Sequence, residues 1–116
     1  MIKLIALIAK QPQLSKAEFA QYYEAHHAPL VARLLPMIHK YTRSYLPDTP
    51  EVPGSEGAAN FDVLTELWFT DGTALASFWQ TIRTPEVSEA IRADEANFLL
   101  SARTQMYEVR EEETEF

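Results

Sequence analysis

The spacing of apolar positions changes along the chain, and each spacing predicts a different element. Residues 2–9 (IKLIALIA) are apolar at odd and even positions alike, as in a strand that is covered on both faces. Residues 61–69 (FDVLTELWF) alternate between an apolar face and a mixed one. Shorter alternating runs over 39–46 and 104–110 complete a set of four predicted strands.

Helical spacing fills the segments between these strands. Ser15 and Glu18 have the spacing of a capping box, so the first helix is predicted to begin at Ser15. Two further helical segments are predicted, from about Thr73 to Ile82 and from Pro85 to about Phe98. The first helix carries an inward stripe of four ring-bearing residues: Phe19, Tyr22, Tyr23 and His26. The order of elements predicts an α+β, ferredoxin-like split βαβ fold, with a four-stranded antiparallel sheet and the helices on one face.

One face of such a sheet is left bare by the helices. The first strand is apolar on both faces, and Leu64 and Trp68 lie on the second face of 61–69, so a monomer would expose a sizeable hydrophobic patch. A second copy covers this patch most economically, and we expect a homodimer whose two sheets meet and enclose a cavity. The alternative is a monomer whose proline-rich loop over 47–60, a candidate flap, folds over the same face.

Two histidines stand where the first helix meets a proline. Pro29 has no backbone N–H and disfavours helical angles at Ala28, so we expect the helix to kink or end near His27. In an undistorted helix His26 would lie within the inward stripe and His27 near its edge, so His26 is predicted to be packed and His27 available. Either histidine also has a structural interpretation, as a hydrogen-bonded core residue or as a complement to the helix dipole.

An acid falls on the buried side of the last predicted helix. Asp94 lies on the apolar stripe that Ile91 marks. Because a lone carboxylate is costly to bury, Asp94 needs a partner. His27 is one candidate, and Arg83 or a backbone donor is another. The neighbouring Glu95 is expected to be exposed.

Composition narrows the classes of function. The 116 residues (13.2 kDa) fit one domain, expected over 1–110, followed by an acidic tail over 111–116. With 17 acidic and 10 basic side chains the net charge is −7, which disfavours a nucleic-acid partner. The chain has no cysteine for disulfide or thiolate chemistry. No apolar run resembles a membrane span or a cleavable signal, so we expect a cytoplasmic protein without a membrane partner.

Four short stretches, taken in order, resemble EthD-domain proteins of the dimeric α/β-barrel superfamily. They are the aromatic pair at 22–23, HHAP at 26–29, FDVLTELWF at 61–69 and DEANFL at 94–99. The resemblance implies a ferredoxin-like fold that dimerises through its sheet. It also implies that His27 is the characteristic histidine of the family and that Asp94 matches its acid. This chain differs in carrying Tyr23 where tryptophan is common and an additional histidine, His26.

The resemblance further implies a small molecule as the ligand. Members resemble a protein encoded with an ether-degrading monooxygenase system, and relatives include dehydratases, cyclases, cofactor-free monooxygenases and lactone isomerases. The residues support cofactor-independent proton transfer on a small hydrophobic or phenolic compound, with His27 as general acid or base and Asp94 orienting it. Asp62, Glu66 and Trp68 fall on the central-strand pattern of the family. Five side chains are expected to contact the substrate: Tyr23, Tyr41, Asp62, Glu66 and Trp68.

Other classes of function fit the residues less well. A metal site from His26, His27 and His39 is disfavoured, since adjacent histidines on a helix point about 100° apart. No glycine-rich phosphate loop supports flavin or nicotinamide binding, and no cofactor is expected. The main rival to an enzyme is a non-catalytic ligand-binding protein, or an accessory protein of a monooxygenase system.

Overall fold

Four strands form one antiparallel sheet in the computed structural model, which describes residues 1–49, 51–52, 57 and 59–116. The strands are β1 (Ile2–Ile8), β2 (Lys40–Tyr45), β3 (Val63–Phe69) and β4 (Gln105–Val109). Their order across the sheet is β2-β3-β1-β4, and every neighbouring pair is antiparallel. This is the strand order of the ferredoxin-like fold, so the predicted fold class is confirmed.

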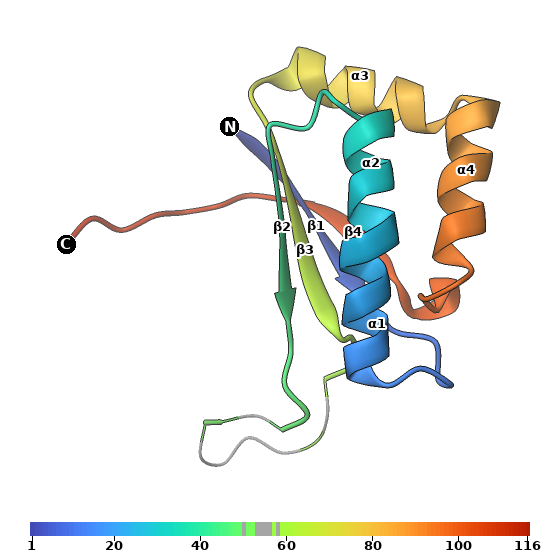
Figure 1. The fold of residues 1–116 in the computed structure, drawn as a ribbon. Coiled ribbons are helices and arrows are strands. Elements are labelled where there is room, and N and C mark those ends of the chain that lie inside the picture. The colour runs from blue at the N-terminus through green and yellow to red at the C-terminus, as the bar shows by residue number, and fades with distance from the viewer. Residues whose placement is uncertain (50, 53–56, 58) are drawn as a thin grey trace.

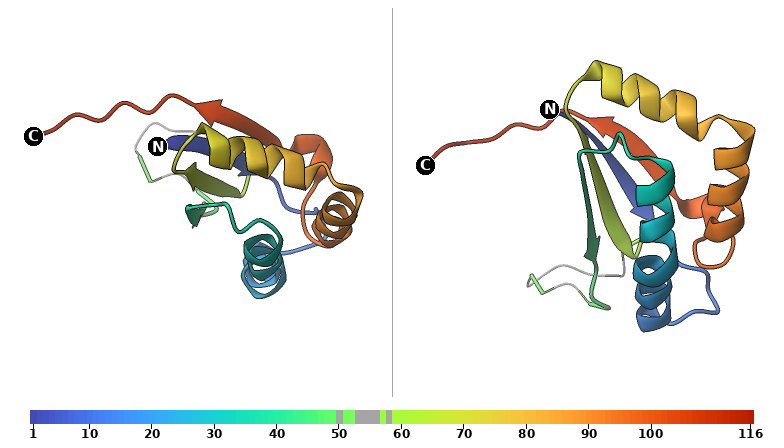
Figure 2. Two further views of the ribbon diagram at one scale, coloured as in Figure 1. Left: turned by 90° about the horizontal axis from the view of Figure 1, so that it is seen from above. Right: turned by 45° about the horizontal axis from the view of Figure 1, so that its top comes forward.

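The helices lie on one side of this sheet (Figures 1 and 2). Their bounds are α1 (Lys16–Tyr22), the π-helical turn η1 (Tyr23–His27), α2 (Ala28–Leu34), α3 (Gly72–Ile82), α4 (Pro85–Glu95) and the 3-10 turn η2 (Ser101–Arg103). In Figure 1, α1, η1 and α2 follow one another as a single rod beside the strands, while α3 crosses one end of the sheet and leads into α4. The rod and α4 are therefore the elements that can enclose a site against the sheet.

Local sequence signals set most helix ends as expected. The Ser15 hydroxyl accepts a hydrogen bond from the backbone of Glu18, whose carboxylate accepts one from the backbone of Ser15, so the predicted capping box is confirmed. The prediction for α4 was too long, because the helix ends at Glu95 rather than near Phe98. Beyond the helix, the Phe98 carbonyl accepts from the N–H of Gln11, and this bond draws the chain back to the end of β1.

Two apolar clusters fill the space between the sheet and the helices. At one end the rings of Phe69 and Phe78 meet at 5.1 Å between centroids. At the other end Phe19, Tyr23 and Phe98 pack with the last residues of β1 and the first of β3. The second cluster includes the ring-bearing residues of the rod, so the aromatic stripe of the sequence is part of the core.

No helix among the described residues covers the opposite face of the sheet (Figure 1). Alternation along β3 turns Val63, Thr65, Leu67 and Phe69 to the helices, and these four side chains are buried. The intervening Leu64 and Trp68 lie on the other face, together with Ile5, Leu7 and Tyr107. We call this second surface the open face. In the single chain its side chains are half-buried or exposed, as the sequence predicted, and coverage of this face by a second copy stays a prediction.

The proline-rich segment and the C-terminal tail are the remaining parts of the chain. Six residues of the proline-rich segment 47–60, expected to act as a flap, lie outside the part of the chain that the structure describes. After Val109 the chain has no helix or strand and points away from the body (Figure 1). Within the described residues, no helix has the length and apolar character needed to cross a membrane.

Candidate active site

The helical rod carries its buried side chains at every fourth position. Phe19, Tyr23, His27, Val31 and Leu35 are all buried. In a regular α-helix, at 100° per residue, such a stripe would drift by about 160° over this length. The π-helical turn from Tyr23 to His27 takes up this drift, since a widened turn holds more residues than an ordinary one. The stripe therefore stays on the side that faces the sheet.

This turn reverses the predicted exposure of the two histidines. His27 is 5% exposed and faces inward, whereas His26 is exposed, so the expectation of a packed His26 and an available His27 was wrong. The helix also neither ends at His27 nor loses helical angles at Ala28, which has φ −60° and ψ −44°. The Ala28 N–H donates to the carbonyl of Tyr23, five residues back, and the widened turn accommodates Pro29 within a continuous rod.

A chain of hydrogen bonds links His27 to the surface. Nδ1 of His27 lies 2.8 Å from Oδ2 of Asp94, and the Tyr22 hydroxyl donates to Oδ1 of the same carboxylate at 2.7 Å. The Asn97 amide donates in turn to the Tyr22 oxygen at 2.9 Å. The carboxylate of Asp94 is thus held at both oxygens, and the sequence-predicted pairing of His27 with Asp94 is present. Arg83 is not the partner of Asp94.

A second polar cluster, formed by three hydroxyl groups, lines the same cavity as His27. The Tyr23 hydroxyl is 2.8 Å from the hydroxyl of Tyr41 and 2.7 Å from that of Thr65. Burial raises the pKa of Tyr23 and of Tyr41, so both phenols keep their protons at neutral pH. These two bonds use two of the three hydroxyl hydrogens, so the cluster from the rod, β2 and β3 can donate one hydrogen bond to an oxygen atom nearby.

An ion pair holds the π-helical turn against β2. The Arg43 guanidinium donates to both carboxylate oxygens of Glu24, at 2.6 and 2.9 Å, and the Tyr45 hydroxyl donates to Glu24 at 2.6 Å. The same guanidinium lies 4.7 Å from the centre of the Tyr41 ring. Arg43 keeps the pKa of Glu24 below its usual value. Glu24 is the residue after Tyr23, and the Arg43 guanidinium lies 5.8 Å from the centre of the Tyr23 ring. The ion pair therefore fixes the position of the phenol cluster.

A cavity of about 80 Å³ separates the two polar clusters. Apolar side chains from the sheet and from α2, α3 and α4 form most of its wall. The polar groups on the wall are His27, Tyr23, Tyr41, Thr65, Thr104 and Glu95. The volume is below the roughly 150 Å³ that holds a benzene molecule in a protein interior. The cavity as it stands therefore admits a small ligand or a few water molecules.

The surroundings of His27 define its protonation state. Burial lowers the pKa of the imidazole, and this outweighs the opposite effect of the Asp94 carboxylate, so the ring is neutral at pH 7. With Asp94 accepting from Nδ1–H, the lone pair is on Nε2. Among the residues that the structure describes, Nε2 makes no hydrogen bond. The ring thus has an unused acceptor on a largely apolar cavity wall.

Glu95 does not have the exposed position that the sequence predicted. It lines the cavity and is half-buried, one helical turn after the buried Ile91. Helical spacing explains this position, because a residue four places after Ile91 lies about 40° from it around the helix and so shares its inward side. Burial raises the pKa of the Glu95 carboxyl above its usual value.

Three side chains expected to contact the substrate lie elsewhere. Glu66 and Trp68 are on the open face, where Lys3 pairs with Glu66 and the ammonium groups of Lys3 and Lys40 each lie 4.8 Å from the Trp68 ring centre. The period-two alternation of β3 turns them away from the helices. Asp62 precedes β3, and its carboxylate accepts a hydrogen bond from the backbone N–H of Lys10 at 2.8 Å. This bond joins the segment before β3 to the segment after β1. None of the three lines the cavity beside His27.

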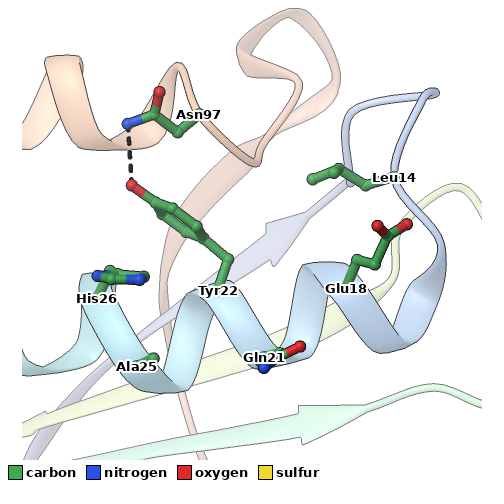
Figure 3. Close-up of a pocket in the computed structure, with 7 residues that line it drawn as sticks. All are labelled: Leu14, Glu18, Gln21, Tyr22, Ala25, His26 and Asn97. Carbon is green, nitrogen blue, oxygen red and sulfur yellow. Dashed lines mark hydrogen bonds between the residues drawn. The ribbon is translucent and has the colours of Figure 1, made fainter.

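The exposed histidine belongs to a shallow groove on the outer side of the rod. His26 stacks on Tyr22 at 4.6 Å between ring centroids. The groove has a volume of about 290 Å³ and is lined by Leu14, Glu18, Gln21, Tyr22, Ala25, His26 and Asn97 (Figure 3). Figure 3 shows the Tyr22 hydroxyl turned towards Asn97, so one ring contacts the groove while its oxygen reaches the Asp94 carboxylate.

No metal centre is formed by the described part of the chain, in which no three histidine, cysteine or acidic side chains converge. The expectation that no cofactor is needed stays a prediction. Three residues of the site were not singled out by sequence reasoning as functional: Tyr22, Thr65 and Asn97. A polar Thr65 between apolar neighbours on a buried strand face was a signal for one of them, whereas the contacts of the other two depend on tertiary structure.

Comparison with known proteins finds a matching domain and solved structures with a similar fold. Residues 11–101 match the EthD domain. A search of curated proteins found no match. Among solved structures, an ethyl tert-butyl ether D (EthD) family protein from Bacillus halodurans is 23% identical, with 97% of this chain and 100% of that chain covered and a TM-score of 0.65.

Two further solved structures extend the likeness. SnoaB, a cofactor-independent oxygenase from Streptomyces nogalater, is 16% identical over 97% of this chain and 94% of its own, with a TM-score of 0.57. A dimeric ferredoxin-like protein from Thermobifida fusca is 14% identical over 93% of this chain and 88% of its own, with a TM-score of 0.53. At these identities the likeness concerns the fold.

Proposed function

The chain belongs to the EthD domain family, since the domain matches residues 11–101, and from this premise we propose that it is a cofactor-independent enzyme of proton-transfer chemistry. The observation that carries the proposal is the 2.8 Å contact of His27 Nδ1 with Asp94 at the wall of an internal cavity. A neutral imidazole with a free Nε2 is a general base at neutral pH. The substrate we propose is a small hydrophobic or phenolic compound that carries an oxygen.

Each polar group of the site has a role in this scheme. Asp94 orients the imidazole and stabilises the cation that forms when Nε2 takes a proton from the substrate. The linked hydroxyls of Tyr23 and Tyr41 donate one hydrogen bond to the substrate oxygen on which negative charge develops. The apolar remainder of the wall excludes water, which strengthens these interactions. This arrangement serves a dehydratase, an isomerase or a cyclase, and it also serves an oxygenase that first deprotonates its substrate.

The size of the cavity restricts the ligand. A ring as large as phenol needs more room than about 80 Å³, so a side chain of the wall must move to admit it. Met106 is suited to this movement, because it lines the cavity from β4, is 44% exposed and has a flexible side chain. We propose that aromatic ligands enter beside Met106 and that smaller ones fit the cavity as it stands.

We further propose that the protein acts as a homodimer through the open face. That face presents Ile5, Leu7, Leu64 and Trp68 without a covering helix, and a related fold from Thermobifida fusca is described as dimeric. The two cavities of such a dimer lie on the helix side of each sheet, so each chain carries a complete set of His27, Asp94 and the phenols. A cytoplasmic location is part of the same proposal.

A variant pair tests whether the site is catalytic. The protein is incubated without cofactor with a panel of small phenols and carbonyl compounds, and products are followed by mass spectrometry while binding is followed by NMR. The change His27→Asn should lower turnover by about 10²-fold or more and leave ligand affinity nearly unchanged. His26→Asn is the matched control, because the exposed ring of His26 faces the outer groove, and its turnover should equal that of the wild type.

The opposite pattern identifies a non-catalytic protein. If the wild type binds compounds without changing any of them, and His27→Asn weakens their binding, the chain is a ligand carrier or an accessory protein of a monooxygenase system. The same incubations under nitrogen and under air decide whether oxygen is consumed.

A further inference from the structure

The cavity holds a second ionisable side chain that the proposed base does not use. Glu95 is the last residue of α4, and it lines the cavity together with Thr104 and Met106 near β4. His27 lines the same cavity from the rod. One ligand in the cavity can therefore contact both groups, Glu95 from α4 and His27 from the π-helical turn.

Glu95 has no partner that would fix its charge. Among the described residues, its carboxyl makes no hydrogen bond and no ion pair. The charged groups near it on its own helix are Arg92 and Asp94, of which Arg92 favours and Asp94 disfavours its ionised form. On the wall of the cavity the other titratable groups are His27 on the π-helical turn and the phenols of Tyr23 and Tyr41. Burial has the largest effect and raises the pKa of the Glu95 carboxyl, so this group keeps its proton to a higher pH than an exposed glutamate.

The two cavity groups are thus complementary in their protonation. His27 is a neutral imidazole able to take a proton, while Glu95, a half-buried glutamic acid, is able to give one. Opposite displacements of two such groups within one cavity are typical of an acid and a base that act on a single substrate.

We propose that Glu95 is the proton donor of the cavity, and that the pair of His27 and Glu95 interconverts the keto and enol forms of a small carbonyl compound. This inference rests on the proposed function of His27 as base. It names the substrate class of that site: a compact ketone or aldehyde with an acidic C–H bond next to its carbonyl group. Glu95 is then a catalytic residue, since its carboxyl touches the substrate oxygen.

The step balances within the cavity. Nε2 of His27 takes the proton from the carbon next to the carbonyl group, and the C–H electron pair forms the new C=C bond. The C=O π bond opens onto oxygen, and the Glu95 carboxyl gives its proton to that oxygen. The products are an enol, an imidazolium and a carboxylate. Transfer of the proton from imidazolium to carboxylate through water restores both groups, and no oxidant or reductant takes part.

The size of the cavity supports a compact substrate. About 80 Å³ accommodates a molecule with a few carbon and oxygen atoms, but not an unmodified aromatic ring. Such a molecule also spans the narrow space between the two walls, so His27 and Glu95 can act on neighbouring atoms of one ligand. Hydroxyacetone has the required size, a carbonyl group and an acidified C–H bond, and it serves as the probe.

Deuterium exchange into hydroxyacetone in D₂O, followed by proton NMR, measures the proposed step directly. The wild type should accelerate exchange over buffer, and His27→Asn should return it to the buffer rate. Glu95→Gln keeps the size of the side chain but cannot give a proton, so the rate should fall by about 10²-fold. Glu89→Gln, an exposed position on the same helix, is the matched control and should equal the wild type.

The outcomes separate the two proposals. Exchange that requires His27 but proceeds at the wild-type rate in Glu95→Gln overturns the role of Glu95 and leaves the proposed function standing. Exchange at the buffer rate in the wild type overturns the substrate class, whereas turnover of other compounds still tests the base. A carbon-13 NMR titration gives a second measurement. The Glu95 carboxyl should titrate above the usual range of a glutamate, and a midpoint within that range would contradict the donor role.

Discussion

The two faces of the sheet differ in how their polar groups are paired and in what surrounds them. On the helix side, buried hydroxyls and charges are bonded to one another, and the unused groups, Nε2 of His27 and the carboxyl of Glu95, both border the cavity. On the open face, Lys3 and Glu66 form an ion pair beside a half-buried Trp68. The unused groups of the helix side belong to the proposed active site, and the uncovered open face is the proposed dimer interface. Alternate residues of one strand, β3, supply both.

The largest effect we expect is on the helix side, where the site is also core. Phe98 is fully buried and its ring lies 4.9 Å from that of His27. The change Phe98→Ala should lower the free energy of unfolding by about 3–5 kcal/mol, since it removes a large buried ring and leaves a cavity. Urea denaturation measures the loss. Phe98→Leu, which keeps most of the apolar volume, should cost much less.

A loss below about 1 kcal/mol for Phe98→Ala would contradict this view of the core. It would mean that the ring contributes little packing energy and that the environment of His27 is open to water. The lowered pKa of His27 then has no physical cause, because burial is its largest source.

The open face should respond differently, by losing assembly and not the fold. Leu64→Glu places a charge at the centre of the proposed interface, and we expect the dimer dissociation constant to rise by about 10²-fold or more. Sedimentation equilibrium measures the change, and circular dichroism should show a folded chain. Ala76→Glu adds the same charge at an exposed position of α3 and should leave the dimer intact. A wild type that sediments as a monomer at micromolar concentration would refute the interface.

The contrast between the faces was visible in the sequence, but the position of the histidines was not. Alternation along 61–69 predicted two unlike faces, and the sheet confirms them. The inward side of the rod was mistaken because a regular α-helix has 3.6 residues per turn, whereas this rod contains a π-helical turn. The buried positions in fact recur every four residues, from Phe19 to Leu35, and only a widened turn can keep them on one side. That regular spacing was the overlooked signal.

Polar contacts over long sequence separations were beyond the reach of such patterns. The pairing of His27 with Asp94 could be proposed as one candidate, because a buried acid needs a partner and few donors were available. The inward position of Glu95 was overlooked, although Glu95 lies four residues after Ile91 in the predicted helix and so shares its side. Trp68 and Glu66 were assigned to the ligand site although alternation places them on the open face.

A smaller effect tests how the hydrogen-bonded chain positions the base. Tyr22→Phe removes the donor to Oδ1 of Asp94 and keeps the ring packing. We expect kcat to fall about 10-fold with little change in KM, because Asp94 is held less firmly while the cavity wall is unchanged. The pH at which activity is half-maximal should also change. Without the hydrogen bond from Tyr22, the negative charge on Asp94 acts more strongly on His27. Tyr45→Phe, which removes a hydroxyl bonded to Glu24, is the control. Equal losses in the two variants would show a general structural effect.

The smallest effect we expect is the dependence of stability on pH that His27 contributes. Burial lowers its pKa below the usual value of about 6.5, so the unfolded chain binds a proton more readily than the folded one. The contribution is therefore complete above about pH 6.5 and is lost as the pH falls through and below that value. Urea denaturation of the wild type and of His27→Asn at successive pH values should give curves that converge towards acid pH, because the variant has no imidazole to protonate. Parallel curves would show that the ring titrates alike in both states, and would remove the link between burial on the helix side of the sheet and the neutral base.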